Sequence, residues 1–441
     1  IKKAADKARK NQGPTLIEAI TFRMRGHEEA SGTKYIDPKK FIKWEKKDPI
    51  RVFEKYLKEK KYLDSAIKKN TLKKIEELIS PALDYAINSK HPQGSIKSEL
   101  DDVFYNNKFK LVKPNNFKNE LRFIDAISTC LMQKMEKDDK ILIMGQDIAE
   151  YGGVFKATDG FLRRFGKDRI RNTPIIESGI IGAAMGLSLN GYKPIVEMQF
   201  SDFISCGFNQ LVNNLAKTYY RWNSSVNVTI RMPSGGGVSA GPFHSQSMEA
   251  WFFHVPGIKI VYPAFAEDAK GLLNSSIDDP NPVLFFEHKG LYRSIKSDVS
   301  DNLYNIEIGK GKIRRSGKNL TIISYGLGVH WALENANKVD KLGIDIEVVD
   351  LLSIQPWDKD IISESIKKTN RVIILHEANL TGGVGAEISA FINENLFEHL
   401  DAPVMRIASL DTPVPFSGNL EKEIYFPINR IEEKIKFIFE Y

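Results

Sequence analysis

The sequence predicts an α/β fold with mainly parallel sheets that carry helices on both faces. Short apolar runs, such as "KILIMG", "NVTIRM" and "PVLFFE", alternate with longer stretches of helical periodicity. This alternation is typical of parallel sheets, because each parallel connection needs a crossover segment that is usually a helix. With 441 residues, 42% of them hydrophobic and 27% charged, the chain is long enough for roughly two to four domains.

The first 117 residues predict a partial domain and a linker. A helix-like start leads into the strand-like run "TLIEAITFRM", as if a domain were entered near its end, and the first residue is Ile1. We therefore expect a fragment of a longer polypeptide. After the polar loop "RGHEEASGTKYIDP", apolar spacing predicts two amphipathic helices at about 39–60 and 64–89. The partial domain is expected to span residues 1–90, and the polar residues 91–117 to form a linker or wrapping segment.

Two complete α/β domains are expected to follow. The helical pattern "LRFIDAISTCLMQKMEK" opens the first, whose strands include "KILIMG" and "KPIVEMQF". A polar break separates it from three further buried-strand candidates, "LTIISYG", "DIEVVDL" and "RVIILHE". The expected boundaries are 118–300 for the first domain, 301–317 for a linker and 318–441 for the second domain.

Composition and charge exclude several classes of protein. The longest apolar runs are shorter than the roughly 18 residues that a membrane helix needs, and the N-terminus lacks the apolar stretch of a secretory signal. Residues 1–117 hold 27 Lys and Arg against 16 Asp and Glu, but no nucleic-acid-binding motif accompanies these basic helix faces. Cys130 and Cys206 lack metal-ligand spacing, so we expect buried thiols in a reducing compartment.

One carboxylate, that of Glu177, stands in the otherwise apolar or small stretch "TPIIESGIIGAAMG". Gly179, Gly182 and Gly186 leave one face of the following helix bare, so a ligand or another helix can approach closely. The alternative is an acid in the first helical turn, which the helix dipole favours by about 0.3–1 kcal/mol. The residues by themselves leave both interpretations open.

Three other places carry candidate functional side chains. Gln199 and Phe203 follow a strand, where ligands bind in open α/β sheets, although a capping residue and a core aromatic would look the same. The glycine-rich loop "MPSGGGVSAGPFHSQSMEAW" brings in His244, and the loop "RMRGHEEASGTKY" brings in His27. Either imidazole can transfer protons near neutral pH or can be structural or solvated. No glycine-rich nucleotide fingerprint lies between a strand and a helix.

Four blocks stand in a specific order along the chain: "GQDIAEYGGVFKATDGFLRRFG", "TPIIESGIIGAAMGLSLNG", "FHSQSMEAWFFHVPGIKIVYP" and "HEANLTGGVGAEI". In this order they resemble the first, decarboxylating component of the thiamine-diphosphate-dependent 2-oxoacid dehydrogenase complexes. Residues 1–90 resemble the tail of an alpha subunit, and residues 118–441 resemble a complete beta subunit. The resemblance implies a fused alpha–beta polypeptide with a transketolase-like pyrimidine-binding domain and a transketolase-type C-terminal domain.

The resemblance also implies roles for the candidate residues. Glu177 would hydrogen-bond the 1′ nitrogen of the cofactor's aminopyrimidine, and Phe203 would stack on that ring. Gln199 would lie near cofactor and substrate, and His244 and His27 would handle protons around the substrate carboxylate and the lipoyl sulfur. The implied reaction is oxidative decarboxylation of a 2-oxoacid, in which thiamine diphosphate does the hard chemistry and a lipoyl group on the acyltransferase core receives the acyl fragment.

Metal binding departs from the family pattern. The family holds magnesium and the diphosphate with Gly-Asp-Gly followed by Asn in the alpha part, and no Gly-Asp-Gly occurs here. The Mg²⁺ ligands are therefore expected in sequence outside these residues, so that the chain is active only with the remaining alpha portion. The resemblance further implies a monovalent cation such as K⁺ near "SSIDDPNP", with Asp279 and Asn281 as candidate contacts.

Substrate and setting follow from the same resemblance. The blocks "EMQFSDF", "FHSQS" and "FFEHKGLYR" favour branched-chain 2-oxoacids such as 3-methyl-2-oxobutanoate, with pyruvate as the alternative, and pocket methylenes separate the two by only about 1–3 kcal/mol. A transketolase-type ketol transferase lacks reason to carry both "GHEEASGTKYI" and "HSQS", and a non-catalytic scaffold predicts a damaged cofactor site. We expect a homodimer of fused chains, alpha2beta2-like, in a bacterial cytoplasm, with the mitochondrial matrix as the alternative.

Overall fold

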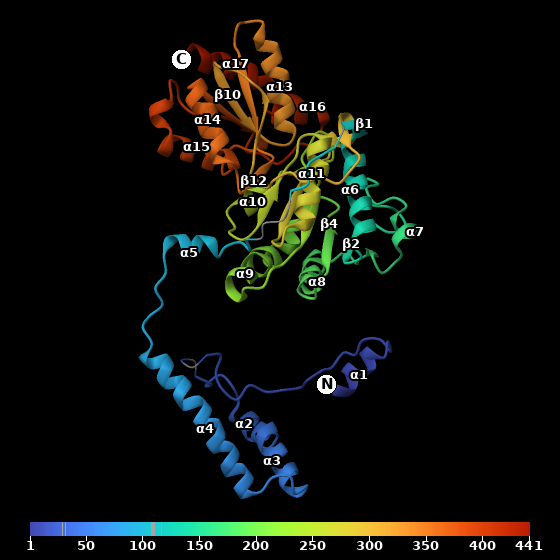
Figure 1. Cartoon of the computed structure of the whole chain (residues 1–441), viewed down its shortest axis with the longest axis vertical. Coiled ribbons are helices and arrows are strands. Elements are labelled where there is room, and N and C mark those ends of the chain that lie inside the picture. Colours follow the sequence, from blue (N-terminus) through green and yellow to red (C-terminus); the bar gives the residue numbers. More distant parts are fainter. Residues whose placement is uncertain (29, 31, 107–110, 116) are drawn as a thin grey trace. The chain divides into compact units, whose positions relative to one another are not determined.

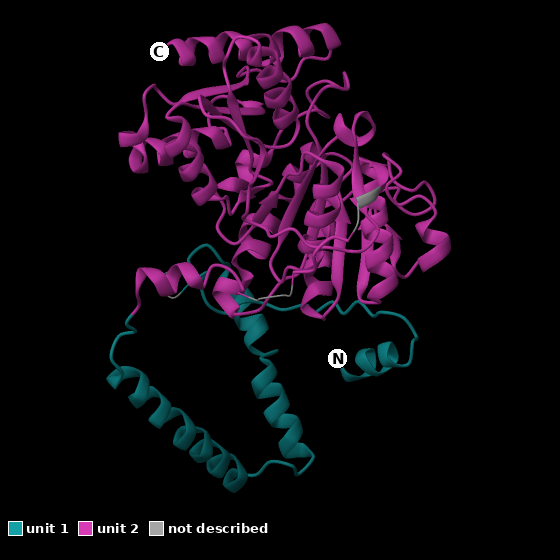
Figure 2. Ribbon diagram, turned by 45° about the horizontal axis from the view of Figure 1, so that its top comes forward, with its two compact units in different colours: residues 1–93 teal, residues 94–441 magenta. Residues whose placement is uncertain are grey.

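The computed structural model describes residues 1–28, 30, 32–106, 111–115 and 117–441. The chain divides into two compact units, residues 1–93 and residues 94–441, which Figure 1 and Figure 2 show by position in the sequence and by unit. Across these described residues, no helix is long and apolar enough to cross a membrane.

Helices are the regular secondary structure in the described part of unit 1. Its helices are α1 (Lys2–Arg9), α2 (Pro38–Glu45), α3 (Pro49–Glu59) and α4 (Ser65–Asn88). The predicted helix at 64–89 is confirmed, but the one at 39–60 is two helices, because Pro49 disfavours a helical conformation at Asp48. Asp48 caps α3 instead, with its Oδ1 accepting from the backbone N–H of Ile50 at 2.8 Å.

The strand predicted for "TLIEAITFRM" is wrong. Residues 13–24 have no regular secondary structure, and nearly all of them are exposed. A strand needs a partner for its backbone groups, and the described part of unit 1 contains no other strand. The apolar pattern of this run therefore does not lead to a sheet within unit 1.

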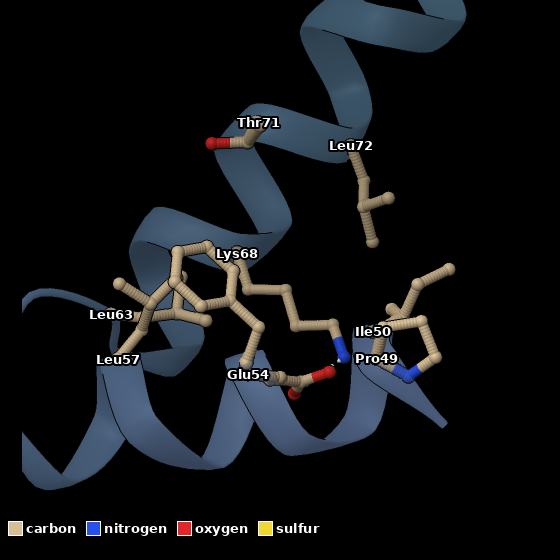
Figure 3. Close-up of a pocket in the computed structure, with 9 residues that line it drawn as sticks. Pro49, Ile50, Glu54, Leu57, Leu63, Lys68, Thr71 and Leu72 are labelled. Carbon is tan, nitrogen blue, oxygen red and sulfur yellow. Dashed lines mark hydrogen bonds and ion pairs between the residues drawn. The ribbon is translucent and has the colours of Figure 1, made fainter. Parts of the chain in front are cut away.

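A pocket of about 660 Å³ lies between α3 and α4 (Figure 3). The Lys68 ammonium donates to Glu54 Oε1 at 2.8 Å, and Lys58 and Lys68 lower the pKa of Glu54 to about 2. None of the residues in the four helices of this unit is buried. The lining is mainly apolar and consists of Pro49, Ile50, Phe53, Glu54, Leu57, Leu63, Lys68, Thr71 and Leu72.

Unit 2 contains two mainly parallel sheets, as predicted, and a two-stranded antiparallel ribbon of β1 (Phe117–Arg122) and β8 (Lys296–Ser300). The first sheet has seven strands, all parallel except for β12 at one edge. In order across the sheet they are β12 (Ser353–Gln355), β6 (Lys259–Val261), β7 (Val283–His288), β5 (Thr229–Ser234), β4 (Lys193–Glu197), β2 (Ile141–Gly145) and β3 (Ile170–Asn172).

The second sheet has five strands and only β9 is antiparallel. In order across the sheet they are β14 (Met405–Ser409), β13 (Val372–Asn379), β10 (Leu320–Ser324), β11 (Ile346–Asp350) and β9 (Lys312–Arg315). The three strands predicted for this domain are confirmed as β10, β11 and β13.

Helices cover the sheets of unit 2 and connect their strands (Figure 1). The α-helices are α5 (Ile96–Asp101), α6 (Phe123–Lys137), α7 (Phe161–Phe165), α8 (Glu177–Leu189), α9 (Ala216–Trp222), α10 (Glu249–Phe253), α11 (Ala266–Asp278), α12 (Leu291–Ser294), α13 (Leu327–Asp340), α14 (Lys359–Thr369), α15 (Val384–Asn395), α16 (Gly418–Leu420) and α17 (Ile428–Glu440). The 3-10 and π segments are η1 (Ser201–Gly207), η2 (Gln210–Leu215), η3 (Phe397–His399) and η4 (Glu421–Tyr425).

Alternate residues of the first sheet build different cores. Ile141 and Ile143 of β2 pack with α6 and α11 on one face, whereas Leu142 and Met144 pack with α8 on the other. The core on the α8 face continues into the second sheet through residues such as Ile323. Because the two sheets share this core and β12 joins the first sheet, the second domain is fixed against the first.

The segment before the first sheet lies along unit 2. Asn281 Oδ1 accepts from the backbone N–H of Tyr105 at 2.7 Å, and the Tyr105 ring meets Tyr219 edge-on at 5.5 Å. Residues 107–110 and 116 of the predicted linker lie outside the described residues. Of the two thiols, Cys130 is buried as expected, whereas Cys206 is exposed, because it lies on the outer side of η1.

Candidate active site

The candidate site lies at the carboxyl ends of β2 and β4. The chain leaves β2 toward β3 at one edge and leaves β4 toward β5 in the opposite direction, so a switch of connection direction falls between them. Ligands of open α/β sheets bind in the crevice at such a point. Gln146 and Asp147 directly follow β2, and Gln199 follows β4, with its Nε2 donating to Asp147 Oδ2 at 3.2 Å.

Glu177 is the first residue of α8, and its side chain is buried. Gln146 Nε2 donates a hydrogen bond to Glu177 Oε1 at 3.1 Å. Among the described residues, this is the donor that the Glu177 carboxylate has. The N-terminal end of a helix favours a negative charge there. The position of Glu177 is therefore compatible with both interpretations, because Glu177 begins a helix and also faces the polar end of β2.

Three rings gather near this sheet end. His244 lies edge-on to Phe203, with ring centroids 5.6 Å apart, and edge-on to Phe200 at 4.8 Å. The two phenylalanines are themselves 5.7 Å apart. The structure thus brings together Phe203 and His244, which the sequence offered as separate candidates, and adds Phe200, which contacts both. All three are only partly buried, so their ring surfaces remain available to a ligand.

A buried ionic network joins three neighbouring strands of the first sheet, β4, β5 and β7. The Arg231 guanidinium donates to both oxygens of Glu287, at 2.7 and 2.8 Å, and also to Glu197. Tyr292 donates to Glu287 at 2.7 Å. Burial raises the pKa of Glu197, with Arg231 opposing and Glu287 adding to that rise. At Gly153, whose φ is +78°, a Cβ would lie 2.7 Å from Glu197 Oε1, so only glycine fits this approach.

The remaining predicted residues are placed elsewhere. His27 is exposed in unit 1, which is described separately from unit 2, so its role stays a prediction. Asp279 pairs with Lys259 at 2.6 Å and accepts from Asn281 at 2.8 Å, while Asn281 also holds Tyr105. These contacts already engage the oxygens that a cation would need.

Of the three glycines after Glu177, only Gly179 is in tight contact within the described part of this chain, since a Cβ there would lie 3.1 Å from Ile176 Cγ1. A Cβ at Gly182 would be 3.7 Å from Gln210, an ordinary contact, and one at Gly186 would meet nothing within 4 Å. A closer approach occurs at Gly207 of η1, where a Cβ would lie 2.3 Å from Ile181 Cδ1 of α8. This contact packs η1 directly against α8.

Known protein families match in three consecutive parts. Residues 1–95 match the model described as dehydrogenase E1 component, residues 119–295 the transketolase pyrimidine binding domain, and residues 309–431 the transketolase C-terminal domain. The chain is 42% identical over 326 residues to the 2-oxoisovalerate dehydrogenase subunit beta of Bacillus subtilis, covering 73% of this chain and 99% of the relative. It is 43% identical over 302 residues to the pyruvate dehydrogenase E1 component subunit beta of the same organism, covering 68% and 92%.

This chain belongs to the thiamine-diphosphate-dependent 2-oxoacid dehydrogenases. A third relative, the mitochondrial 2-oxoisovalerate dehydrogenase subunit beta 2 of Arabidopsis thaliana, is 42% identical over 325 residues, covering 73% of this chain and 90% of the relative. The solved structure titled "Split gene transketolase, inactive beta4 tetramer" has a TM-score of 0.60 at 21% identity, covering 73% of this chain and 98% of that chain. The transketolase-like fold class is thereby confirmed.

The described residues fit the aminopyrimidine half of the family's cofactor. An aminopyrimidine presents ring nitrogens to a carboxylate and a flat π face to an aromatic side chain. Glu177 has one oxygen that accepts from Gln146 and a second without a protein donor among the described residues, and Phe203 offers a partly exposed ring. For the diphosphate half, the described residues contain no cluster of three or more His, Cys, Asp or Glu side chains that could hold a metal ion.

Sequence reasoning missed several residues of this site. Gln146 and Asp147 were visible only as two polar residues directly after a predicted strand, in the block "GQDIAEYGG". Phe200 gave no signal distinct from a core aromatic. The pairing of Arg231 with Glu197 could not be found from sequence, because the two residues lie on adjacent strands 34 positions apart.

Proposed function

We propose that this chain carries out the decarboxylating step of a branched-chain 2-oxoacid dehydrogenase complex and passes the acyl fragment to a lipoyl group. The observation that supports this proposal most is the position of the buried Glu177 near the carboxyl ends of β2 and β4. Phe203 of η1 and His244 of the glycine-rich loop form a ring pair near the same sheet end. When bound, thiamine diphosphate supplies the carbon nucleophile and the electron sink for loss of CO₂.

Each site residue has a stated part in this proposal. Glu177 exchanges a proton with the aminopyrimidine, and Gln146 holds the carboxylate in place. Phe203 stacks on the pyrimidine ring, and Gln199, oriented by Asp147, faces the substrate. His244 donates and accepts protons at the substrate carboxylate and the lipoyl sulfur, and a proton-transfer role of the same kind is proposed for His27 of unit 1.

The substrate is decided by a kinetic comparison. The identities to the 2-oxoisovalerate and pyruvate enzymes, 42% and 43%, do not separate the two substrates. We propose the branched-chain acid, because the segments around Gln199 and His244 favour it. In the complete enzyme, kcat/KM for 3-methyl-2-oxobutanoate should exceed that for pyruvate by about tenfold or more, as expected for two methyl groups in an apolar pocket. A preference for pyruvate would overturn the choice of substrate and leave the reaction class intact.

Mg²⁺ and K⁺ remain proposals. We assign the binding of Mg²⁺ and the diphosphate to an alpha-type portion outside this sequence, because the Gly-Asp-Gly signature does not occur in it. K⁺ at Asp279 and Asn281 has weaker support, since Lys259 already neutralises Asp279. An unchanged thermal midpoint when KCl replaces tetramethylammonium chloride would remove K⁺ from the proposal.

The proposed assembly is a homodimer of fused chains that docks on the acyltransferase core. Its support is an exposed apolar face at α8, which would be buried by a second copy. A monomer in sedimentation at micromolar concentration would contradict it. Two free thiols, one of them exposed, fit the cytoplasmic location that we also propose. The α8 face consists of Ile175, Ile176, Gly179, Ala183, Gly186 and Leu189.

A further inference from the structure

The loop that carries His244 is fastened by carboxylates of the C-terminal domain. This glycine loop (residues 234–244) leaves β5 and has left-handed backbone at Gly235, with φ +82°, and at Gly237, with φ +81°. Such turns point consecutive N–H groups to one side and create a concavity that attracts an anion. Here the anions are protein side chains, because two buried glutamates of the C-terminal domain accept these N–H groups.

Glu377, at the end of β13, makes the first attachment. Its Oε1 accepts from the backbone N–H of Gly236 at 2.6 Å, and its Oε2 contacts His288 Nε2 at 2.5 Å. Burial opposes ionisation of Glu377, but His288 and the Gly236 N–H outweigh it and lower the pKa of Glu377. A Cβ at Gly235 would lie 2.2 Å from His288 Nε2, so the loop backbone is pressed against this pair.

Glu421, the first residue of η4, makes the second attachment and is only 2% exposed. Its Oε1 accepts from Gly237 N at 2.8 Å, and its Oε2 accepts from Ser239 N at 3.2 Å. Among the described residues, the side-chain hydrogen bonds of Glu421 all come from the glycine loop. Charge-assisted bonds of this kind are about twice as strong as neutral ones.

The far end of the same loop reaches the candidate site. His244 rests against Phe200 and Phe203, and the backbone N–H of Gln246, two residues further on, donates to Asp202 Oδ1 of η1 at 3.1 Å. The backbone N–H of Gly235 donates to Gln246 O at 3.3 Å and closes the loop on itself. A displacement of the glycines would therefore move the His244 imidazole, because hydrogen bonds and ring contacts hold both ends of the loop.

We propose that Glu421 and Glu377 are positioning residues for His244: the C-terminal domain holds the glycine loop by its backbone and so sets where the imidazole stands against the rings of η1. The inference rests on the proposed function only in assigning catalysis to His244. The attachment itself is independent of the reaction. The attachment gives the C-terminal domain a role in the active site. The cofactor residues, which lie at the first sheet, would not by themselves give it that role.

The test uses Glu421→Ala and Glu421→Gln in the complete enzyme, with Glu423→Ala as the matched control. Glu423 is exposed on the same turn and is bonded to Asn429 instead of the loop. Glu421→Ala should speed amide hydrogen exchange of residues 236–239 at least tenfold and lower kcat by about ten- to a hundredfold, as a displaced catalytic group does. Glu421→Gln keeps one acceptor oxygen and should give an intermediate loss.

Two further readouts separate positioning from general damage. Exchange of the thiazolium carbon proton, which depends on Glu177, should stay at the wild-type rate in Glu421→Ala. In a His244→Ala background, Glu421→Ala should lower kcat no further, because residues that act through one another are non-additive. Multiplying losses in the double variant, or wild-type exchange of the loop in Glu421→Ala, would overturn the inference. Wild-type turnover of His244→Ala would instead refute the proposed role of His244.

Discussion

Glu249, in the block that follows His244, is predicted to make stability depend on pH. Its side chain is completely buried in α10, where Oε1 accepts from the Tyr325 hydroxyl at 2.8 Å. The other oxygen, Oε2, is buried without a partner among the described residues. Burial raises the pKa of Glu249 to about 7 from an ordinary 4.5. The folded protein therefore holds this proton more tightly than the unfolded chain does.

The sign and size follow from proton linkage. A carboxyl whose pKa is raised by folding contributes stability that is fully present below pH 4.5 and is lost as the pH rises through about 7. A shift from 4.5 to about 7, at roughly 1.4 kcal/mol per pKa unit, amounts to about 3 kcal/mol, most of which is lost between pH 5 and pH 8. Glu249→Gln removes the ionisation and keeps an oxygen for Tyr325.

The assay is urea unfolding followed by tryptophan fluorescence at pH 5 and pH 8. Relative to wild type, Glu249→Gln should gain roughly 2–3 kcal/mol in free energy of unfolding between the two pH values, whatever its stability at either one. The exposed Glu423→Gln is the control and should show no such change. A difference between Glu249→Gln and wild type that is constant with pH would refute the reasoning about burial of this carboxylate.

Two other substitutions test the site and its support. Phe203→Ala should weaken thiamine diphosphate binding in the complete enzyme about tenfold by calorimetry, since a stacked ring is worth roughly 0.5–1.5 kcal/mol beyond its buried area, and an unchanged Kd would remove Phe203 from the cofactor site. Arg231→Met should lower the free energy of unfolding by about 3–5 kcal/mol, because it leaves Glu197 and Glu287 buried without their cation, and a loss below about 1 kcal/mol would contradict the account of that network.

The sheets of unit 2 could be predicted from the sequence because their strands are buried on both faces. A strand such as β2, all of whose residues are buried, appears as a continuous apolar run. The strand prediction failed where a neighbouring strand was needed. The apolar run "TLIEAITFRM" has the pattern of a strand but has no neighbouring strand in the described part of unit 1. The split at Pro49 could have been predicted, since Asp followed by Pro is a helix-start signal.

The candidate site could be predicted in its local parts and not in its long-range ones. Glu177, Phe203 and His244 became candidates through the resemblance of four ordered sequence blocks, because each residue by itself fits a structural role as well. Glu377 and Glu421 meet the glycine loop across 141 and 184 positions, and no local pattern records such a pairing. Each looks like an ordinary charged residue until the second sheet packs beside the first.

The most direct test of the central claim is exchange of the thiazolium carbon proton of bound thiamine diphosphate, measured in deuterium oxide in the complete enzyme. Glu177→Gln keeps the side-chain size and the hydrogen-bonding capacity toward Gln146 but cannot exchange a proton with the aminopyrimidine. Exchange should fall by about a hundredfold or more, the typical contribution of a general acid–base group, while the fold and the thermal midpoint are retained. Wild-type exchange in Glu177→Gln would contradict the assignment of Glu177 and, with it, the site proposed at the ends of β2 and β4.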